Sequence, residues 1–565
     1  MRGYISAARL SIVELLILSF AWGDQLKIKH SKLKTHPFLM PLNHRLEQLQ
    51  RVVVTANQMS QIEARLFAAG MPVAALMEKV AVLVAGRIQA LYPAVEHKTV
   101  GVLVGPGHNG GDALVVAREL HLNGYGVRLY CPFEHLKELT ACHARYAASL
   151  AIATEQQVAT LQSCDLLVDG LFGVGLTRSL SPDLAAVVDQ INGWGLPVLS
   201  IDLPSGLHTD TGAALGTAIC ATHTFCLGLW KRAFLQDQAL AYTGEAELID
   251  FGLPLLDVQA VVPPLEVQRI TPQMAIAALP LPRPVATHKY REGHLLLVCG
   301  SRQYMGAALL SALAARASGV GMLSVAVPES LRSLLIAQVP DALVLGCPET
   351  PEGAIARLPE GVDLGAYQAI ACGPGLTAAA IAVVQQVLAA PCPLVLDADG
   401  LNNLASLGRV SSLHQRPATT ILTPHPGEFR RLFPTLNGQP VAEQMADRIE
   451  VVQAAAQLSG AIVLLKGARV AIAVPKRNPP GIPTVFLNPH STPALARGGS
   501  GDVLTGLLGG LLAQVASRQT PPELVAVTAT WWHAHAAMFA AQTCSELGVD
   551  ASSLVKSLIP ALGGL

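Results

Sequence analysis

Short apolar runs that end in glycine or a polar residue alternate with helical patterns along most of this chain. Five runs in the second half predict strands that end directly before Gly300, Gly373, Asp397, Thr423 and Lys466. Alternating strands and helices favour a doubly wound parallel sheet, which binds ligands at the carboxyl ends of its strands. Packing alone does not require polar residues or glycine at five successive strand ends. We therefore expect a binding site at this edge.

The length and the proline distribution predict more than one domain. Of the 565 residues, 51–255 form a first alternation of strands and helices, and 281–565 form a second. Domains of ordinary size are much shorter than the whole chain. The segment 256–280 holds four prolines and is predicted to be a Pro-rich linker. The halves share no obvious repeat, so we expect two unrelated α/β domains after a poorly patterned extension, 1–50.

The composition argues against several kinds of partner. A net charge of −1 does not fit a basic surface for nucleic acid. No uninterrupted apolar run of about 18 residues follows residue 50, so we predict no membrane span there. The ten cysteines form no CxxC pair and no cluster with histidine, which favours reduced cysteines in a cytoplasmic protein and no zinc site.

The first residues allow two interpretations. Arg2 and Arg9 precede a short apolar stretch, 12–22, which resembles the core of a signal peptide. No clear cleavage site follows it. The alternative is a mis-assigned start with Met40 as the initiator, because regular patterning begins only near Val52.

A glycine-rich loop follows the first predicted strand, 98–104. Residues 105–110 fit the pattern GxGxxG, which alone would indicate a Rossmann dinucleotide site. That site needs an acidic residue after the second strand, but the strand predicted at 126–130 ends without one. A plain NAD dehydrogenase is therefore disfavoured, and the added Asn109 and Asp112 mark a different loop.

Two further strand ends carry oxygen donors. Asp169 and Asp202 each follow an apolar run, and Asn109 and Ser205 lie in neighbouring turns. Such oxygens suit hard cations, and the small number of charges among them fits a monovalent ion. A carboxylate beside the ligand, such as Asp202, is expected to act as a general base. Taken singly, each aspartate also fits a turn cap.

A glycine-rich turn at 497–501 precedes a long apolar helix predicted from Val503. The first N–H groups and the dipole of such a helix favour an anion. Asp502 at this place either caps the helix or takes a proton from a hydroxyl near a phosphate. Lys466, after an apolar strand, is expected to face phosphate. His425, between two prolines, is either a ligand contact or a turn residue.

Residues 52–255 resemble the YjeF N-terminal family of NAD(P)H-hydrate epimerases. The motifs that carry the resemblance are GHNGGD at 107–112, DGLFGVG at 169–175 and DLPSG at 202–206. One departure from the family pattern is His108, where the family usually has asparagine.

This resemblance implies an epimerase with a potassium ion held by Asn109, Asp169 and Ser205, and with Asp202 as the catalytic base. It implies the following substrate-binding residues: His108, Asn109, Gly110, Gly111, Asp112, Gly173, Val174, Gly175, Leu176, Thr177, Arg178, Ser179 and Asp202.

Residues 280–565 resemble the YjeF C-terminal family, the ADP- or ATP-dependent NAD(P)H-hydrate dehydratases of ribokinase-like fold. The motifs lie at 287–293, 300–308, 373–375, 397–400, 425–428, 466–467 and 499–502. The last motif alone would indicate only a ribokinase-like enzyme.

The second resemblance implies a nucleotide, ADP or ATP with magnesium, and Asp502 as the base at the substrate hydroxyl. The implied nucleotide-binding residues are Lys466, Gly467, Ala468, Arg469, Val470 and Gly501. The implied contacts to the hydrate are Ala307, Gly373, Gly375, His425 and Asp502.

We therefore predict a bifunctional metabolite-repair enzyme with a Rossmann-like first domain and a ribokinase-like second domain. The first domain interconverts the R and S epimers of NADHX and NADPHX, and the second dehydrates the S epimer at the expense of ADP or ATP. The alternatives are a small-molecule kinase, or a dehydratase whose first domain binds dinucleotide without catalysis. We expect a cytoplasmic homo-oligomer with no nucleic-acid or membrane partner.

Overall fold

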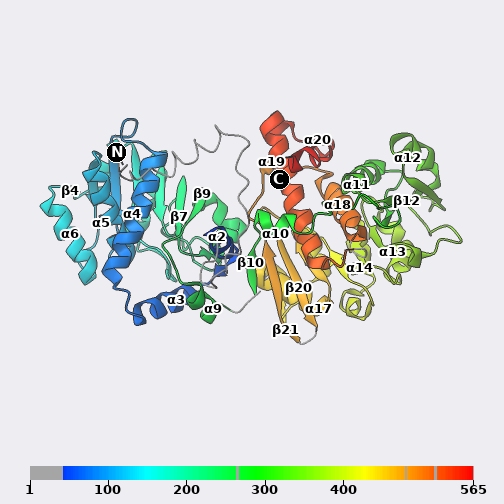
Figure 1. Cartoon of the computed structure of the whole chain (residues 1–565), viewed down its shortest axis with the longest axis horizontal. Coiled ribbons are helices and arrows are strands. Elements are labelled where there is room, and N and C mark those ends of the chain that lie inside the picture. The colour runs from blue at the N-terminus through cyan, green and yellow to red at the C-terminus, as the bar shows by residue number, and fades with distance from the viewer. Residues whose placement is uncertain (1–41, 263–265, 478–479, 515–517, 564–565) are drawn as a thin grey trace, which may run out of the picture. The chain divides into compact units, whose positions relative to one another are not determined.

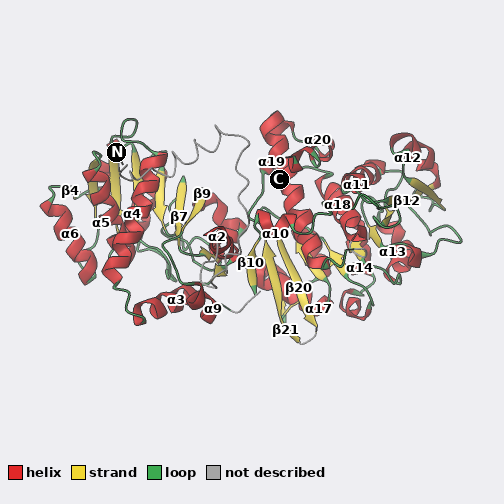
Figure 2. Ribbon diagram, in the orientation of Figure 1, coloured by secondary structure: helices red, strands yellow, loops and turns green. Residues whose placement is uncertain are grey.

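Two predominantly parallel sheets organise this chain, and helices flank both (Figure 1, Figure 2). The computed structural model describes residues 42–262, 266–477, 480–514 and 518–563. The signal-peptide and Met40 interpretations fall on residues 1–41, outside this described part. Within the described ranges, none of the helices combines the length and the apolar composition that a bilayer crossing requires.

The first sheet contains seven parallel strands in the described part, in the order β4-β3-β2-β5-β6-β7-β9. Their bounds are β2 Thr99–Val104, β3 Gly126–Tyr130, β4 Ala153–Glu155, β5 Leu166–Gly170, β6 Val198–Ile201, β7 His223–Leu227 and β9 Glu245–Ile249. The chain runs outward from β2 through β4 and then returns to β5 on the other side of β2. The carboxyl ends of β2 and β5 are therefore the switch point at which such sheets bind ligands.

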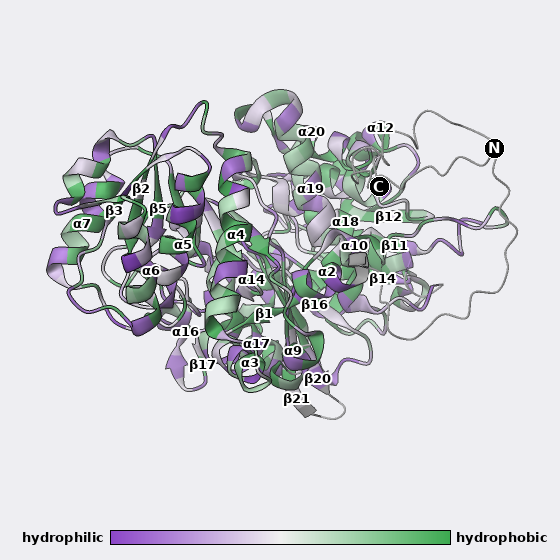
Figure 3. Ribbon diagram, turned by 60° about the vertical axis from the view of Figure 1, so that its left-hand side comes forward, coloured by the Kyte–Doolittle hydropathy of each residue, from purple (hydrophilic) through white to green (hydrophobic). Residues whose placement is uncertain are grey.

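Alternating side chains of the first sheet enter two cores. Val102 and Val104 of β2 pack with the helices α4 (Val73–Leu91) and α5 (His108–Leu122). Leu103, between them, packs on the opposite face with α7 (Pro182–Asn192). Both faces are covered, as in doubly wound folds. Figure 3 shows the apolar character of α4, whose ribbon is mainly green with a few purple turns.

The other helices of this half are α3 (Ala56–Ala68), α6 (Glu138–Ser149), α8 (Leu240–Thr243) and α9 (Leu255–Val261). A two-stranded pair of β1 (Val53–Val54) with β8 (Trp230–Lys231) accompanies the sheet. The predicted strand at 126–130 is confirmed with the same bounds.

The second sheet contains ten strands in the described part, in the order β10-β21-β20-β19-β16-β15-β14-β11-β12-β13. Their bounds are β10 Val267–Arg269, β11 His294–Val298, β12 Met322–Pro328, β13 Leu343–Cys347, β14 Ala369–Cys372, β15 Leu394–Leu396, β16 Thr420–Leu422, β19 Ile462–Leu465, β20 Ala471–Arg477 and β21 Pro480–Leu487. The strands from β13 to β19 are parallel, whereas β20 runs antiparallel to both of its neighbours.

This sheet also divides two cores. Leu295 and Leu297 of β11 pack with one set of helices, and Leu296 and Val298 with the other. The first set is α11 (Met305–Ala317), α18 (Ser500–Gln514), α19 (Pro522–Gly548) and α20 (Ala551–Ser557). The second set is α13 (Ile381–Leu388), α14 (Ala398–Ser406), α15 (Pro426–Leu432) and α17 (Arg448–Ser459). The predicted α/β architecture of two parallel sheets is confirmed.

The predicted linker at 256–280 contains regular structure. Residues Val267–Arg269 pair in parallel with β21 and form the edge of the second sheet. The helix α10 (Pro272–Ile276) begins at Thr271, whose side chain accepts a hydrogen bond from Met274 N. Proline is tolerated at the start of a helix and in an edge strand. The prolines of this segment are therefore compatible with α10 and β10, and they do not show that the segment is an unstructured linker. The domain boundaries themselves stay predictions.

Regular structure also begins before Val52, contrary to the expectation from sequence. The helix α2 (Leu42–Arg51) holds Leu49, whose side chain is fully buried. The neighbouring Leu46 is 38% exposed. Among residues 45–51, whose burial is described, Leu49 is the one buried position, and this is too narrow an apolar stripe to reveal a helix in the sequence.

Two helices at the sites begin earlier than predicted. The helix α5 begins at His108, within the predicted glycine-rich loop, because Gly107 is its N-cap and the GGD motif lies in its first turns. A side chain at Gly110 is impossible, since its Cβ would lie 1.9 Å from the carbonyl oxygen of Gly105. The helix α18 begins at Ser500 instead of Val503. Asp502 therefore lies within the first turn of its helix rather than at the cap.

Candidate active sites

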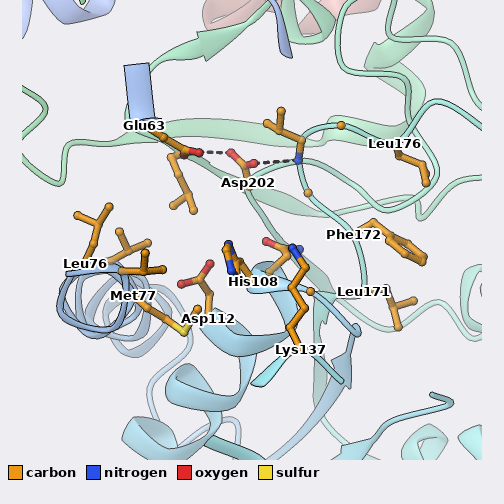
Figure 4. A pocket seen from close by; sticks show the side chains of 18 of the residues that line it. Glu63, Leu76, Met77, His108, Asp112, Lys137, Leu171, Phe172, Leu176 and Asp202 are labelled. Carbon is orange, nitrogen blue, oxygen red and sulfur yellow. Dashed lines mark hydrogen bonds between the residues drawn. The ribbon is translucent and has the colours of Figure 1, made fainter. Parts of the chain in front are cut away.

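The first site is a cavity of about 380 Å³ at the carboxyl ends of β2, β5 and β6. The predicted residues that line it are His108, Asn109, Asp112, Gly173, Val174, Gly175, Leu176 and Asp202. Figure 4 shows Glu63 and Asp202 pointing toward one another, with His108, Asp112 and Lys137 extending into the same space.

Asp202 has a strained backbone and a buried cationic partner. Its φ of 69° is unusual for a residue other than glycine, and such strain occurs at functional sites. One carboxylate oxygen, Oδ1, pairs with the ammonium group of Lys231. The other, Oδ2, accepts from Val174 N at 3.2 Å. These two contacts orient the carboxylate of Asp202.

Two more carboxyl groups face this cavity, and both have a raised pKa. Burial, followed by the charges of Asp202 and Glu63, holds the pKa of Asp112 well above its ordinary value. Burial and Asp202 likewise raise the pKa of Glu63, although Lys231 opposes them. Neighbouring groups whose environments separate their pKa values are suited to act as an acid and a base.

The entrance of α5 combines helix N–H groups with a lysine. His108 is the first residue of the helix, and burial and the nearby Lys137 lower the pKa of its imidazole. Lys137 also lines the cavity. A helix start beside a lysine suits a phosphate group. Because the pKa of His108 is lowered, the imidazole adds no positive charge to this anion site.

Asp169 lies fully buried behind this cavity. Its Oδ1 accepts from Ser205 Oγ at 2.6 Å, and its Oδ2 accepts from Ser205 N at 2.9 Å and Ser200 Oγ at 2.8 Å. Burial raises the pKa of Asp169, and these hydrogen bonds partly offset the rise. Ser205 Oγ also lies 3.1 Å from the carbonyl oxygen of Phe172.

Some predicted substrate residues lie away from the cavity lining. Gly111 belongs to the first turn of α5, where an added Cβ would lie 2.7 Å from the side chain of Met77. Gly110 and Gly111 thus have a packing role in the described structure. Thr177, Arg178 and Ser179 are exposed.

The second site is organised around a buried ion pair. Asp397, directly after β15, is 2% exposed, and its Oδ1 accepts from Lys466 Nζ at 2.7 Å. Its Oδ2 accepts from Thr505 Oγ1, also at 2.7 Å. Asp397 thus connects the strand end before Lys466 with the first turns of α18. Breaking such a buried pair by removing one partner is strongly destabilising.

Asp502 is held next to this ion pair. Its carbonyl oxygen accepts from Ser311 Oγ at 3.0 Å, which fixes the first turn of α18 against α11. Burial, followed by the charge of Asp397, raises the pKa of Asp502 to about 6, and Lys466 opposes the rise. A carboxylate with a pKa close to neutrality is suited to general base catalysis.

All six predicted nucleotide-binding residues line one cavity of about 600 Å³. They are Lys466, Gly467, Ala468, Arg469, Val470 and Gly501. Gly501 approaches the ion pair closely, since its Cβ would lie 3.4 Å from Lys466 Nζ. His533 forms part of the wall, and burial lowers its pKa to about 4, so this imidazole is neutral at pH 7.

The other predicted hydrate contacts gather around Asp397. An added Cβ at Gly373 would lie 1.8 Å from the carbonyl oxygen of Asp397. An added Cβ at Gly375 would lie 3.0 Å from the Cβ of Ala307. The turn that follows β14 can therefore pass close to the end of β15 at Gly373 and close to α11 at Gly375.

His425 occupies a helix start. It is the N-cap of α15, and its Nδ1 accepts from Gly427 N at 3.0 Å. Burial and the nearby Lys466 lower the pKa of His425. The turn role that the sequence left open is therefore present, and the side chain of His425 is half exposed.

Both halves match known protein families. Residues 73–233 match the family described as YjeF-related protein N-terminus, and residues 295–560 match the family described as NAD(P)H-hydrate dehydratase. A bifunctional NAD(P)H-hydrate repair enzyme Nnr from Thermosynechococcus vestitus is 54% identical over 512 residues, which cover 90% of this chain and 97% of that protein. The chain belongs to the family of bifunctional NAD(P)H-hydrate repair enzymes. It accordingly has an epimerase domain and a dehydratase domain.

The chain is also similar to two further proteins. The Nnr protein of Synechocystis sp. is 52% identical and covers 90% of this chain and 95% of its own length. An ADP/ATP-dependent NAD(P)H-hydrate dehydratase from Bacillus subtilis, co-crystallized with ATP/Mg²⁺, is 32% identical with a TM-score of 0.41. It covers 50% of this chain and 93% of its own length.

The oxygen donors behind the epimerase cavity fit a monovalent cation. In the described part of the chain, Asn109 Nδ2 is buried without a hydrogen-bond partner, and the two ends of an amide are interchanged by a simple flip. The charge of Asp169 is offset by hydrogen bonds rather than by a described cationic side chain. Buried charges are usually paired or bound to metals. The donor set of Asn109, Asp169 and Ser205 therefore suits potassium.

Several residues of both repair sites were not predicted from the sequence. In the epimerase domain these are Glu63, Lys137 and Lys231, and in the dehydratase domain they are Thr505 and His533. Asp397 was predicted to lie at a strand end of the binding site, but its ion pair with Lys466 was not predicted. Lys231 lies in a strand of only two residues, which gave no pattern.

Proposed function

We propose that the dehydratase domain uses ADP or ATP to phosphorylate the hydroxyl at carbon six of S-NADHX or S-NADPHX, with Asp502 as the base. Asp502 takes the hydroxyl proton while the oxygen bonds to the terminal phosphorus, and the bond between that phosphorus and the bridging oxygen breaks, so that AMP or ADP leaves. The Lys466–Val470 loop and Gly501 hold the nucleotide. Fixed N–H groups and a lysine stabilise the charge that develops on the transferring group.

Elimination completes the reaction. The carbon–oxygen bond at carbon six breaks, phosphate leaves with its electron pair, and the lone pair of the ring nitrogen forms the carbon–nitrogen double bond. Loss of a proton from carbon five then restores the dihydronicotinamide ring of NADH or NADPH. Phosphate is a far better leaving group than hydroxide, which explains why a dehydration consumes a nucleotide.

The observation that carries this proposal is the position of Asp502. It lies in the first turn of α18, beside Gly501 and close to the Asp397–Lys466 pair, with a pKa raised to about 6. A helix start favours negative charge, so the first turn of α18 accommodates the carboxylate of Asp502 as well as a bound phosphate. Magnesium would accompany the nucleotide phosphates, since it binds through one or two carboxylates plus phosphate oxygens. Each oxygen of Asp397 accepts one protein hydrogen bond, so lone pairs remain for such a contact.

In the epimerase domain, we propose that Asp112 acts as the acid and Asp202 as the base. Protonated Asp112 gives its proton to the departing hydroxyl while the ring nitrogen forms a double bond to carbon six. Water then adds to the opposite face and gives its proton to Asp202. Lys231 holds the carboxylate of Asp202 in place, and exchange with solvent returns the proton to Asp112. Potassium held by Asn109, Asp169 and Ser205 would supply fixed positive charge behind the site.

The cytoplasmic location, the homo-oligomer and the domain boundaries at 255 and 281 stay predictions from the sequence. The same holds for the choice between ADP and ATP. None of these predictions changes which residues are assigned to the two active sites.

The test measures product formation from S-NADHX with ADP or ATP. We expect NADH and phosphate to appear in equal amounts, and Asp502→Asn to lower kcat by roughly 100-fold or more, as for a lost general base. The matched control is Asp341→Asn, which removes a carboxylate from an exposed ion pair with Arg316 and should keep full activity. Full activity in Asp502→Asn would refute the role of this residue.

A further inference from the structure

A segment of the epimerase domain lies against the proposed nucleotide loop of the dehydratase domain. The segment 232–240 comprises two short 3-10 helices and the first residue of α8. Within it, Asp237 Oδ1 accepts from Arg469 N at 2.7 Å. The backbone carbonyl of Phe234 accepts from Arg469 Nε at 3.2 Å. The loop 466–470 is therefore bonded to the other domain at its centre.

Asp237 also pairs with a buried arginine that supports the same loop. The guanidinium of Arg448, 5% exposed, contacts Asp237 Oδ2 through Nη1. Its Nη2 donates to the carbonyl oxygens of Lys466 at 2.9 Å and Leu465 at 3.3 Å. Among the described residues, Asp237 is the carboxylate that neutralises Arg448. A buried guanidinium that loses its carboxylate partner lowers the stability of the protein. Asp237 therefore fixes the position of Arg448, which in turn binds carbonyl oxygens at the start of the loop.

The residue before Asp237 binds the helix that carries Arg448. Gln236 is fully buried, its Nε2 donates to Asp447 Oδ1 at 3.1 Å, and its Oε1 accepts from Arg448 N at 3.3 Å. These bonds lie at the N-terminus of α17, which Asp447 caps. The epimerase segment thus fixes both the start of α17 and the loop after β19.

The loop itself has a glycine where this contact requires one. An added Cβ at Gly467 would lie 2.4 Å from the guanidinium nitrogens of Arg448 and 2.6 Å from Asp237 Oδ2. The absence of a side chain at Gly467 therefore leaves room for the ion pair. In addition, Leu240 of the epimerase segment lines the cavity that the loop residues line.

We infer that residues 234–240 of the epimerase domain complete the nucleotide site of the dehydratase domain. Asp237 is a positioning residue for the 466–470 loop, and Leu240 is one wall of the cavity. This inference rests on the proposed assignment of that cavity to ADP or ATP. It implies that a substitution in one domain changes the nucleotide affinity of the other without touching its catalytic groups.

The test uses the full-length protein and compares KM with kcat in the dehydratase reaction. Asp237→Asn keeps the size of the side chain but removes the charge that Arg448 requires. We expect KM for the nucleotide to rise about tenfold, with kcat within about twofold and the epimerase rate unchanged. The matched control is Asp257→Asn, which removes a carboxylate paired with Arg65 inside the epimerase domain and should leave KM unchanged.

A second variant tests the wall of the cavity independently of the ion pair. Leu240 is half-buried, so Leu240→Ala should fold and should raise KM for the nucleotide by roughly threefold, with the epimerase rate unchanged. Titration calorimetry with ADP or ATP should show the same weakening for both variants.

The outcomes separate this inference from the proposed function. A KM within twofold of wild type in both variants overturns the inference if Lys466→Ala still weakens the nucleotide. An unchanged KM in Lys466→Ala shows that the nucleotide binds elsewhere, and then the proposed site fails together with the inference. A fall in kcat alone in Asp237→Asn also contradicts it, because a positioning role for the nucleotide loop acts on binding.

Discussion

At the scale of single residues, the dehydratase site contains three ionisable side chains with different surroundings, those of Asp397, Lys466 and Asp502. Asp397 is buried and paired with Lys466, so its charge is neutralised in place. Asp502 forms no ion pair with another described residue, and burial beside Asp397 raises its pKa to about 6. One carboxylate therefore holds the site together while the other remains free to exchange a proton.

The raised pKa of Asp502 predicts the pH dependence of dehydration. A base acts in its ionised form, and the ionised fraction of Asp502 falls as the pH decreases through about 6. We expect kcat/KM to be constant above this value and to fall below it. The charge of Asp399 contributes to the rise, so Asp399→Asn should move the acidic limb to lower pH. A limb that stays in place in this variant, or activity that increases below pH 6, would contradict the assignment. The measurement is the pH profile of kcat/KM for both proteins.

The sequence located the strand-end residues of both sites but not their partners. Asp169, Asp202 and Lys466 directly follow apolar runs, which is a local signal that periodicity reveals. Lys231 and Thr505 contribute through contacts 29 and 108 residues away in the chain. Such pairings depend on the order of the strands and on helix rotation, neither of which a local pattern contains.

At the scale of elements, the close contact of α18 with α11 places Asp502. Gly506 faces Ser311, and Ser311 Oγ donates to the carbonyl oxygen of Asp502. The apolar run after the glycine-rich turn predicted this helix, but it did not predict the start at Ser500. That start depends on Ser500 Oγ, which donates to the carbonyl oxygens of Leu495 and Arg497 in the preceding turn.

This contact predicts a strong effect of a single methyl group. In Gly506→Ala, the new Cβ would lie 2.0 Å from the backbone oxygen of Ser311, so the helices must separate. We expect a loss of about 1–3 kcal/mol in the free energy of unfolding of this domain. The control is Gly86→Ala in α4, where no atom lies within 4 Å and the change should be neutral or stabilising. Denaturant unfolding of both variants measures the difference, and equal stability would show that the helices are not in tight contact.

At the scale of the whole molecule, each site lies at the carboxyl edge of its own parallel sheet. The alternation of strands and helices was sufficient to predict both sheets, because buried parallel strands are almost continuously apolar. The edge strand β10 was not predicted, since three residues among prolines resemble a linker. The role of residues 234–240 also required the structure, because it depends on contacts between elements more than 200 residues apart.

The central claim is that one chain repairs both epimers of the hydrate. The direct measurement follows the absorbance of the reduced nicotinamide ring when the full-length protein and a nucleotide act on a mixture of R- and S-NADHX. We expect complete recovery of NADH in one rapid phase. In Asp202→Ala, the rapid phase should stop at the fraction that is the S epimer, and the rest should follow at the rate of spontaneous epimerisation. The claim is contradicted if the unaltered protein stops at that same fraction, or if a stable phosphorylated alcohol accumulates and no NADH appears.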